Sequence, residues 1–478
     1  MTIANMKGFK RKADAKSLKE AEKVLTAELG DRKILIDPEL FGPYSEDYSF
    51  CGSHPPDIVV RAESVTDVQT VFRVATALGI PVTPRGLGTG KSGGSLPIHG
   101  GIVLSLDRMN RMLEVNREDM VAVAEPGIIT ADFMEQVEQE NLFYPPDPNS
   151  LKICSLGGNV ACNAGGPRAL KYGVTRNYII SLEVVLPNGE VHQFGRRTIK
   201  WVTGYDLLGL MVGSEGTLGV ITQITTKLIP RPSSVQTALV SFPDIDCASR
   251  GINRALGTGI TPRTLEFLDN HALNAVRAKT PGRFPENAGA LLILETDGTS
   301  EERAMEDLEK AANACVDEGA IDVLVALDNR QREKIWEPRR VLSMTLAETA
   351  PKKMSEDIVV PRSQIPTMLQ RVRQISEKTG IRMATYGHAG DGNLHVNILY
   401  DDSTEQQAER AVLALMEETV SLGGTISGEH GVGLSKRDFI ALEHSDPLIQ
   451  LQRTLKKQFD PAGILNPGKI FPAGGSHE

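Results

Sequence analysis

Residues 84–95 read PRGLGTGKSGGS, and this glycine-rich stretch decides which folds the chain can adopt. Its backbone N–H groups lie beside positions that have no Cβ, and Thr89, Ser92 and Ser95 add hydroxyl groups. Successive unobstructed N–H groups form a concave site for an anion. The stretch therefore predicts an ordered loop that binds an anion such as a diphosphate.

Two common phosphate-binding motifs do not fit the stretch. Residues 90–92 read GKS, but a P-loop requires glycine where the chain has Arg85, and further glycines block the helix that should follow. Residues 88–93 satisfy GxGxxG, but only eight residues separate them from the strand expected at Ile102. That is too short for the crossover helix of a dinucleotide-binding fold, so we expect neither fold.

The surrounding pattern predicts an α+β protein with a helical lead-in over 1–55. Apolar runs predict a first domain of strands and helices up to a linker at 231–234, and a hairpin around Pro187-Asn188-Gly189. Beyond the linker, two strand–helix–strand units predict a mixed sheet with helices on one face. The strands expected in these two units are 238–242, 264–268, 290–294 and 322–326.

Two more glycine-rich loops are expected, at 155–166 and 212–221, and the first follows the run YPPDP at 144–148. Close backbone approach at three separate places indicates a long ligand. Tight turns in a β-rich domain would explain one such loop, but not all three.

Composition excludes several classes of protein. The 478 residues carry a formal net charge of −9, which argues against nucleic-acid binding. No run is apolar enough to span a membrane, and residues 1–12 lack the apolar core of a secretory signal. The five cysteines are scattered, so we expect no iron–sulfur cluster within the chain. We expect a cytoplasmic protein, with peripheral membrane association or an organellar matrix as alternatives.

A metal site is predicted near the C-terminus. If Asp391-Gly392 forms a two-residue turn, His388 and His395 lie directly opposite each other with Cβ atoms about 5 Å apart, and Asn397 shares their face. The run SGEHGVG at 427–433 adds Glu429 and His430. Converging imidazoles and a carboxylate suit a divalent cation with open coordination positions. A hydrolase that activates water is one chemistry open to such a site.

Together these motifs resemble a known family. PRGLGTGKSGG, LGGNVACNAGGPRALKYGVTRN and TGYDLLGLMVGSEGTLGVITQ resemble the FAD domain of the PCMH-type (vanillyl-alcohol oxidase) flavoproteins. YGHAGDGNLHVN, SGEHGVG and FDPAGILNPGK resemble their branch of glycolate oxidase, D-lactate dehydrogenase and D-2-hydroxyglutarate dehydrogenase. The resemblance spans about 50–472. It implies an FAD-binding domain at 56–234, a substrate or cap domain at 235–425 and a segment at 426–478 that returns to the FAD domain.

The resemblance also implies the FAD contacts. The first loop would hold the pyrophosphate, the second the isoalloxazine and ribityl chain, and the third the adenosine end. Leu87 and Lys91 depart from the family, which often has a small and an apolar residue there. The expected contacts are Arg85, Gly86, Gly88, Thr89, Gly90, Ser92, Gly93, Gly94, Pro146, Asp147, Ser155, Gly157, Gly158, Asn163, Gly165, Gly166, Glu215, Gly216, Gly219, Ile221 and Asn466.

By the same resemblance, His388, His395 and Glu429 bind zinc, manganese or iron, and His430 is the base. Arg339 would bind the substrate carboxylate, and Asn397 belongs to the catalytic site. The implied reaction is hydride transfer from a D-2-hydroxy acid to flavin N5, which yields a 2-oxo acid.

The substrate and partners are implied less sharply. The hydroxyglutarate enzymes carry lysine where this chain has Ser355, so the resemblance favours D-lactate or glycolate. Alternatives are a dicarboxylate dehydrogenase of the D-2-hydroxyglutarate type and a flavin subunit of a multi-subunit glycolate oxidase. The electron acceptor would be external: an iron–sulfur protein, a quinone, a cytochrome or an electron-transferring flavoprotein. A homodimer is compatible with this reading.

Overall fold

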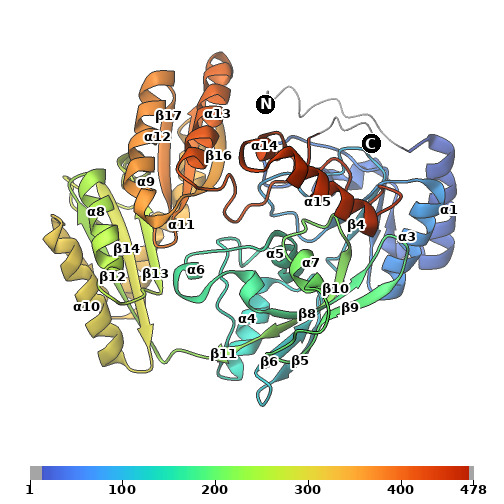
Figure 1. Cartoon of the computed structure of the whole chain (residues 1–478), viewed down its shortest axis with the longest axis horizontal. Helices are drawn as coiled ribbons and strands as arrows, with labels where there is room; N and C mark the ends of the chain where they lie inside the picture. Colours follow the sequence, from blue (N-terminus) through green and yellow to red (C-terminus); the bar gives the residue numbers. More distant parts are fainter. Residues whose placement is uncertain (1–12, 473–478) are drawn as a thin grey trace.

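The computed structural model of the chain describes residues 13–472, which form two lobes (Figure 1). Residues 1–12, for which no secretory signal is predicted, and 473–478 lie outside the described residues. The first lobe contains the glycine-rich segments and the C-terminal helices, and the second lobe is a sheet flanked by helices. This two-part α+β architecture is the predicted one.

The first sheet of the first lobe has the order β1-β2-β4-β3. Strands β2, β4 and β3 are parallel, whereas β1 from the lead-in pairs antiparallel to β2. The β3–β4 connection contains no helix, as predicted, so the crossover of a dinucleotide-binding fold is absent there. The elements are α1 (Ala15–Leu29), β1 (Ile34–Leu35), α2 (Gly42–Ser45), β2 (Ile58–Arg61), α3 (Val65–Leu78), β3 (Val82–Arg85) and β4 (Ile102–Ser105).

The second sheet of this lobe is antiparallel, in the order β5-β6-β10-β8-β9. The predicted hairpin is its β8–β9 pair. The elements are β5 (Met112–Asn116), β6 (Val121–Ala124), α4 (Thr130–Gln139), β7 (Leu142–Phe143), α5 (Leu156–Cys162), α6 (Ala169–Tyr172), β8 (Ile179–Val185), β9 (Val191–Gly195), α7 (Leu207–Met211), β10 (Val220–Lys227) and β11 (Ile229–Pro230).

The second lobe is built on one seven-stranded sheet, in the order β15-β12-β14-β13-β17-β18-β16. Its elements are β12 (Ser234–Phe242), α8 (Ile245–Leu256), β13 (Thr264–Leu268), α9 (Asn270–Arg277), β14 (Ala290–Gly298), α10 (Glu301–Asp317), β15 (Asp322–Val325), α11 (Asn329–Glu348), β16 (Lys352–Val359), α12 (Ile365–Thr379), β17 (Arg382–His388), β18 (Asn393–Tyr400) and α13 (Glu405–Ser421).

Two details of this sheet were predicted wrongly. All of its strand pairs are antiparallel rather than mixed, because β14 lies between β12 and β13, the two strands that helix α8 joins. Helices also cover both faces rather than one. Helices α8, α10, α12 and α13 pack on one face, and α9 and α11 pack on the other.

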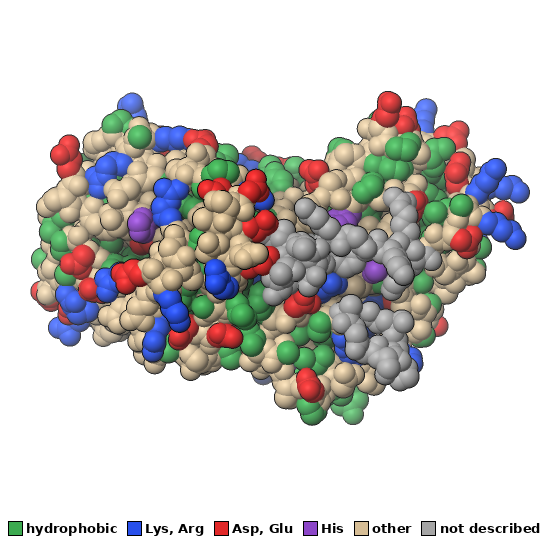
Figure 2. Space-filling view, turned by 90° about the horizontal axis from the view of Figure 1, so that it is seen from above, with side chains coloured by type: hydrophobic (Ala, Val, Ile, Leu, Met, Phe, Trp, Pro, Cys, Tyr) green, Lys and Arg blue, Asp and Glu red, His purple; other side chains and the backbone are tan. Residues whose placement is uncertain are grey.

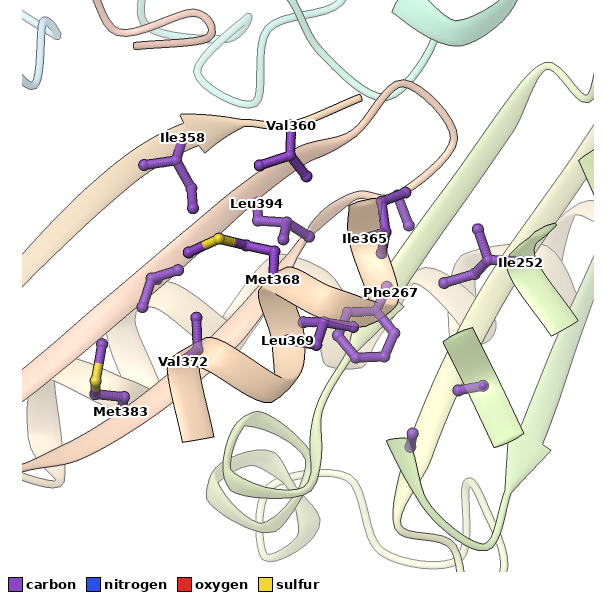
Figure 3. Packing of buried hydrophobic residues seen from close by; sticks show 14 of the residues in the cluster. Ile252, Phe267, Ile358, Val360, Ile365, Met368, Leu369, Val372, Met383 and Leu394 are labelled. Atoms are coloured by element: carbon purple, nitrogen blue, oxygen red, sulfur yellow. The ribbon is translucent and has the colours of Figure 1, made fainter. Parts of the chain in front are cut away.

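Side-chain alternation in the central strands separates the core from the site. In β18, Leu394 and Val396 point into the apolar core together with Phe267 and Met368, as Figure 3 shows for the residues it labels. The residues between them, including His395, point to the opposite face. The buried core therefore fixes the direction of the polar side chains on the α11 side of the sheet.

The C-terminal segment crosses back to the first lobe, as predicted. Helix α14 (Ile440–Glu443) and helix α15 (Asp446–Phe459) lie against the first lobe in Figure 1. Beyond them Leu465 forms a parallel bridge with Val82 of β3. Residues near the end of the chain thus extend the first sheet.

Charged side chains of both signs lie on the molecular surface. Acidic and basic side chains are interspersed over the face shown in Figure 2. Among residues 13–472, no helix is both long and apolar enough to cross a membrane.

Candidate active site

A cavity of about 530 Å³ lies where the three glycine-rich segments meet the second lobe. The first lobe contributes backbone from all three segments. The second lobe and the segment after it contribute Arg340, Ser343, Met344, Tyr386, His395, Glu429 and His430. The cavity therefore joins the predicted cofactor loops to the predicted catalytic cluster.

The first loop presents mostly backbone to the cavity. Gly88 has a φ of 71°, which favours glycine, and a Cβ at Gly90 would meet no protein atom within 4 Å. The Arg85 guanidinium donates to the carbonyls of Pro43 and Glu46 at 2.7 and 2.6 Å. Arg85 thus fastens the loop to the lead-in as well as bordering the cavity.

The second segment is not the loop that we predicted. Residues 156–162 form α5, whose first turn is capped by Ser155 Oγ at 3.2 Å from the Gly158 nitrogen. Gly157 lies so close to Pro126 that a Cβ would come within 2.5 Å of the proline Cβ. Close packing of the helix, rather than loop flexibility, explains this glycine.

In the third segment, Glu215 links the cavity lining to the backbone of the C-terminal segment. Its carboxylate accepts hydrogen bonds from the backbone nitrogens of Val432 and Gly433 at 2.8 and 2.7 Å. Asn466 donates to the carbonyl oxygens of Gly94 and Glu215 at 2.9 and 3.0 Å. These two residues tie the loops and the C-terminal segment together.

Most expected cofactor contacts border the cavity, and the others are not part of its lining. Those that border it are Arg85, Gly86, Gly88, Thr89, Gly90, Ser92, Gly94, Ser155, Gly157, Gly158, Glu215, Gly216, Gly219 and Ile221. The expected contacts outside its lining are Gly93, Pro146, Asp147, Asn163, Gly165, Gly166 and Asn466.

The predicted hairpin forms, but its register differs from the prediction. A four-residue turn, 389–392, pairs His388 with Asn393 and Tyr386 with His395. The two histidines are therefore not directly opposite. They are diagonal neighbours on one face, and their ring centroids are 5.2 Å apart. The prediction that the two imidazoles converge on one face was therefore correct, whereas the prediction of a two-residue turn was wrong.

The cluster has the spacing of ligands around one cation. Glu429 Oε1 lies 3.6 Å from His388 Nε2 and 3.4 Å from His395 Nε2. Ligand atoms bonded to one tetrahedral zinc at about 2.1 Å lie about 3.4 Å apart. These three residues thus fit a divalent metal.

Asp357 is better suited to holding the chain than to binding an ion. One of its oxygens, Oδ2, accepts the backbone N–H groups of Gly428, Glu429 and His430 at 2.9, 2.8 and 2.9 Å. The other, Oδ1, accepts a bond from Asn393. Asp357 therefore fixes the turn that carries Glu429 and His430.

His430 lies beside the candidate metal cluster. Its ring stacks on His395, with centroids 5.3 Å apart, and its Nε2 lies 3.7 Å from Glu429 Oε1. Burial lowers the pKa of His430 to about 4, although the nearby Asp357 carboxylate opposes this shift. The imidazole is accordingly neutral at pH 7.

The pKa of His388 is shifted in the opposite direction. Burial alone would lower its pKa, but the Glu266 carboxylate, which is hydrogen-bonded to Nδ1, raises that pKa well above the ordinary value. Glu266 also accepts a bond from Arg339 Nε at 2.6 Å. A single buried carboxylate thus contacts a predicted metal ligand and the predicted substrate arginine.

Arg339 and Asn397 are buried beside the cavity rather than in its lining. The Arg339 guanidinium lies over the Tyr386 ring, 4.7 Å from its centroid. Arg339 Nη1 and Asn397 Oδ1 are buried without a hydrogen-bond partner among the described residues. These two polar atoms are available to a bound molecule that reaches past the lining.

Glu266, Tyr386 and Asp357 were not predicted as site residues from the sequence. Glu266 gave a usable signal, because it is the one charged residue in the expected strand 264–268, TLEFL. Tyr386 gave none, since a tyrosine in a strand is ordinary.

Comparisons with known proteins agree with this geometry. The family described as FAD linked oxidases, C-terminal domain, matches residues 231–470, and an FAD binding domain family matches residues 56–195. The chain belongs to the FAD-linked oxidases. This FAD-linked oxidase is an oxidoreductase, and its cavity fits FAD because glycine-rich backbone from three segments borders it.

Similar proteins have related names. Glycolate oxidase subunit GlcD of Bacillus subtilis is 40% identical over 87% of this chain and 89% of its own length. A D-lactate dehydrogenase of Anaerostipes hadrus is 35% identical over 93% and 95%. A D-2-hydroxyglutarate dehydrogenase of Stutzerimonas stutzeri is 34% identical over 92% and 96%.

A solved structure supports the fold. The structure of p-cresol methylhydroxylase with substrate bound superposes with a TM-score of 0.79. It covers 97% of this chain and 99% of its own chain, at 18% identity. At that identity the likeness concerns the fold alone.

Proposed function

We propose that this FAD-linked oxidase converts a D-2-hydroxy acid to the 2-oxo acid with the help of a divalent metal. The observation that carries the proposal is the position of His430. This neutral, largely buried imidazole borders the cavity that the glycine-rich segments line, and it lies 3.7 Å from Glu429 in the candidate metal cluster. Relatives named for glycolate, D-lactate and D-2-hydroxyglutarate support the substrate class.

Each group then has a defined task. The glycine-rich segments would hold FAD, which would supply a two-electron acceptor for the hydride. His388, His395 and Glu429 would hold a divalent cation, which would supply positive charge to lower the pKa of the substrate hydroxyl. His430 Nε2 accepts the hydroxyl proton. Asp357 keeps His430 in place by accepting a hydrogen bond from the backbone N–H of His430. Arg339 Nη1 is free to bind the carboxylate of the substrate.

The sequence favours D-lactate or glycolate as substrate and zinc or manganese as metal, with a cytoplasmic location and an external electron acceptor. The GlcD relatives are named as subunits, which supports a partner subunit as acceptor.

The test is an anaerobic absorbance titration of the purified protein with D-lactate, glycolate and D-2-hydroxyglutarate, with L-lactate as control. Bleaching of the flavin band by D acids but not by L-lactate is the expected result. A flavin that none of these acids bleaches would refute the proposed reaction.

A further inference from the structure

Helix α6 of the first lobe reaches into the second lobe. In Figure 1 this short helix lies on the side of the first lobe that faces the sheet of the second lobe. Its Leu170 is 9% exposed and belongs to the apolar core of the second lobe, together with Leu265 of β13 and Ala389. Helix α6 also follows the second glycine-rich segment directly in the chain. A side chain next to the predicted flavin-binding backbone is therefore buried in the core of the other lobe.

Leu170 contacts the turn that follows His388. A Cβ placed on Gly390 would come within 2.3 Å of Leu170 Cδ2 and 3.0 Å of Leu170 Cγ, and the three nearest heavy atoms all belong to this leucine. The φ of Gly390 does not lie in the left-handed region, so the backbone at that position accepts alanine. Contact with Leu170, rather than backbone conformation, therefore explains the glycine at 390.

The turn connects this contact to both parts of the candidate metal cluster. It begins directly after His388, and the Gly390 nitrogen donates to a carbonyl of β13 at 3.3 Å. It ends before Asn393, whose side-chain amide donates to Asp357 Oδ1 at 2.6 Å. Asp357 in turn accepts a hydrogen bond from the Glu429 nitrogen. A shift of the turn would move His388 directly and Glu429 through Asp357.

The segment that leads into α6 also approaches Glu429. A Cβ on Gly165 would lie 3.1 Å from Glu429 Oε2, which is closer than ordinary van der Waals contact. Residues 165–170 thus contact the side chain of one candidate ligand and the turn that carries another.

Hydrogen bonds to one buried carboxylate fasten α6 to the second lobe. Asp297, near the end of β14, has a fully buried side chain. It accepts bonds from Lys171 and from the Tyr172 hydroxyl, the latter at 2.8 Å. It also accepts a bond from Arg263 Nη1 at 2.8 Å. Charge-assisted bonds of this kind are strong, so they hold the helix with Leu170 in the core.

We propose that Leu170 positions the candidate metal cluster by holding the turn after His388 against the first lobe. The inference rests on the proposed function, in which His388 and Glu429 hold a divalent cation. Leu170 does not border the cavity. It is therefore a positioning residue that acts through Gly390 and not on the substrate.

The Zn²⁺ affinity of the holoenzyme, measured by competition with a chelator, tests the proposal. Leu170→Ala should weaken Zn²⁺ binding by about 10–100-fold, whereas Leu170→Met, which keeps the side-chain volume, should weaken it less than about threefold. Gly390→Ala should also weaken Zn²⁺ binding, because its methyl group meets Leu170. In the double variant that methyl group occupies space left by Leu170→Ala. The double variant should therefore bind Zn²⁺ more tightly than either single variant.

The matched control is Leu308→Ala in helix α10. Leu308 is fully buried in the same apolar cluster, but α10 packs on β12 and β14, and β13 separates β14 from the strand that ends at His388. Leu308→Ala should lower Tm and leave Zn²⁺ affinity unchanged. Bound FAD, measured by flavin absorbance, should stay at the wild-type amount in every variant. If Leu170→Ala does not fold, Leu170→Val should show a smaller loss of Zn²⁺ affinity of the same kind.

Three results would overturn the inference. The first is an unchanged Zn²⁺ affinity in Leu170→Ala, and the second is a double variant whose loss equals the product of the two single losses. The third is loss of FAD in parallel with Zn²⁺, which would make α6 a general link between the lobes. In each case a wild type that binds Zn²⁺ leaves the proposed function intact. A wild type that binds neither Zn²⁺ nor Mn²⁺ would refute the proposed metal cluster together with this inference.

Discussion

Replacing Glu266 with glutamine tests how the candidate metal cluster is held. Glu266 is fully buried and contacts both His388 Nδ1 and Arg339 Nε. Burial opposes its ionisation, but these two cationic partners lower the pKa of Glu266 to about 2. The carboxylate is therefore charged at neutral pH, and Glu266→Gln removes that charge with little change in shape.

The Glu266→Gln substitution should lower both the stability of the second lobe and its affinity for metal. Loss of one partner from a buried ion pair costs about 3–5 kcal/mol because the Arg339 guanidinium stays buried without its counterion. For a lobe of this size that lowers Tm by roughly 10 °C. Loss of the group that orients a ligating imidazole also weakens metal binding by about 10–100-fold.

The matched control is Glu295→Gln in the neighbouring strand β14. Glu295 is buried, accepts bonds from Trp336 and Thr237 at 2.8 and 2.7 Å, and does not contact His388. Its loss should lower Tm without changing metal affinity. Differential scanning calorimetry and a metal-chelator competition assay measure the two quantities. Equal metal affinity in the two variants would refute an orienting role for Glu266.

Three further predictions concern other parts of the molecule. His430→Ala should retain FAD while slowing its reduction by a hydroxy acid about 10²–10⁴-fold in stopped-flow absorbance; fast reduction would exclude it as the base. His388→Ala should lose bound metal by elemental analysis, and unchanged content would exclude the cluster. Burial lowers the pKa of Lys469 to about 7. Above pH 7 the unfolded chain therefore binds a proton there that the folded chain lacks. The free energy of unfolding of the wild type should rise relative to that of Lys469→Met by at most about 1.4 kcal/mol per pH unit between pH 7 and 9. A Tm difference between the two proteins that does not change with pH would contradict this burial effect.

Local patterns in the sequence were enough to predict most elements of the first lobe. Helix α3 lies where an apolar stripe at helical spacing ends at Gly79, and the β8–β9 hairpin surrounds its turn residues. Such signals depend on residues close in sequence. The order of strands in the second lobe does not, which explains why the insertion of β14 between β12 and β13 was not foreseen.

The candidate site shows the same division. The glycine-rich segments and the clustered histidines were enough to predict most of the residues that border the cavity or form the candidate metal cluster. The exact turn after His388 depends on how residues 389–392 pack, and the contact of Glu266 with His388 depends on pairing between β13 and β17, which are 122 residues apart in the chain at this contact. Long-range pairing of this kind leaves little trace in a single sequence.

The bridge between Leu465 and Val82 has a consequence for biosynthesis. Strand β3 leaves the ribosome hundreds of residues before its C-terminal partner, and domains otherwise tend to fold as they emerge. In the nascent first lobe that edge of the sheet stays unpaired, and the hydrogen bonds of Asn466 are missing, until residues 465 and 466 have been translated. We therefore expect stalled or truncated chains to be poor flavin acceptors and good chaperone clients.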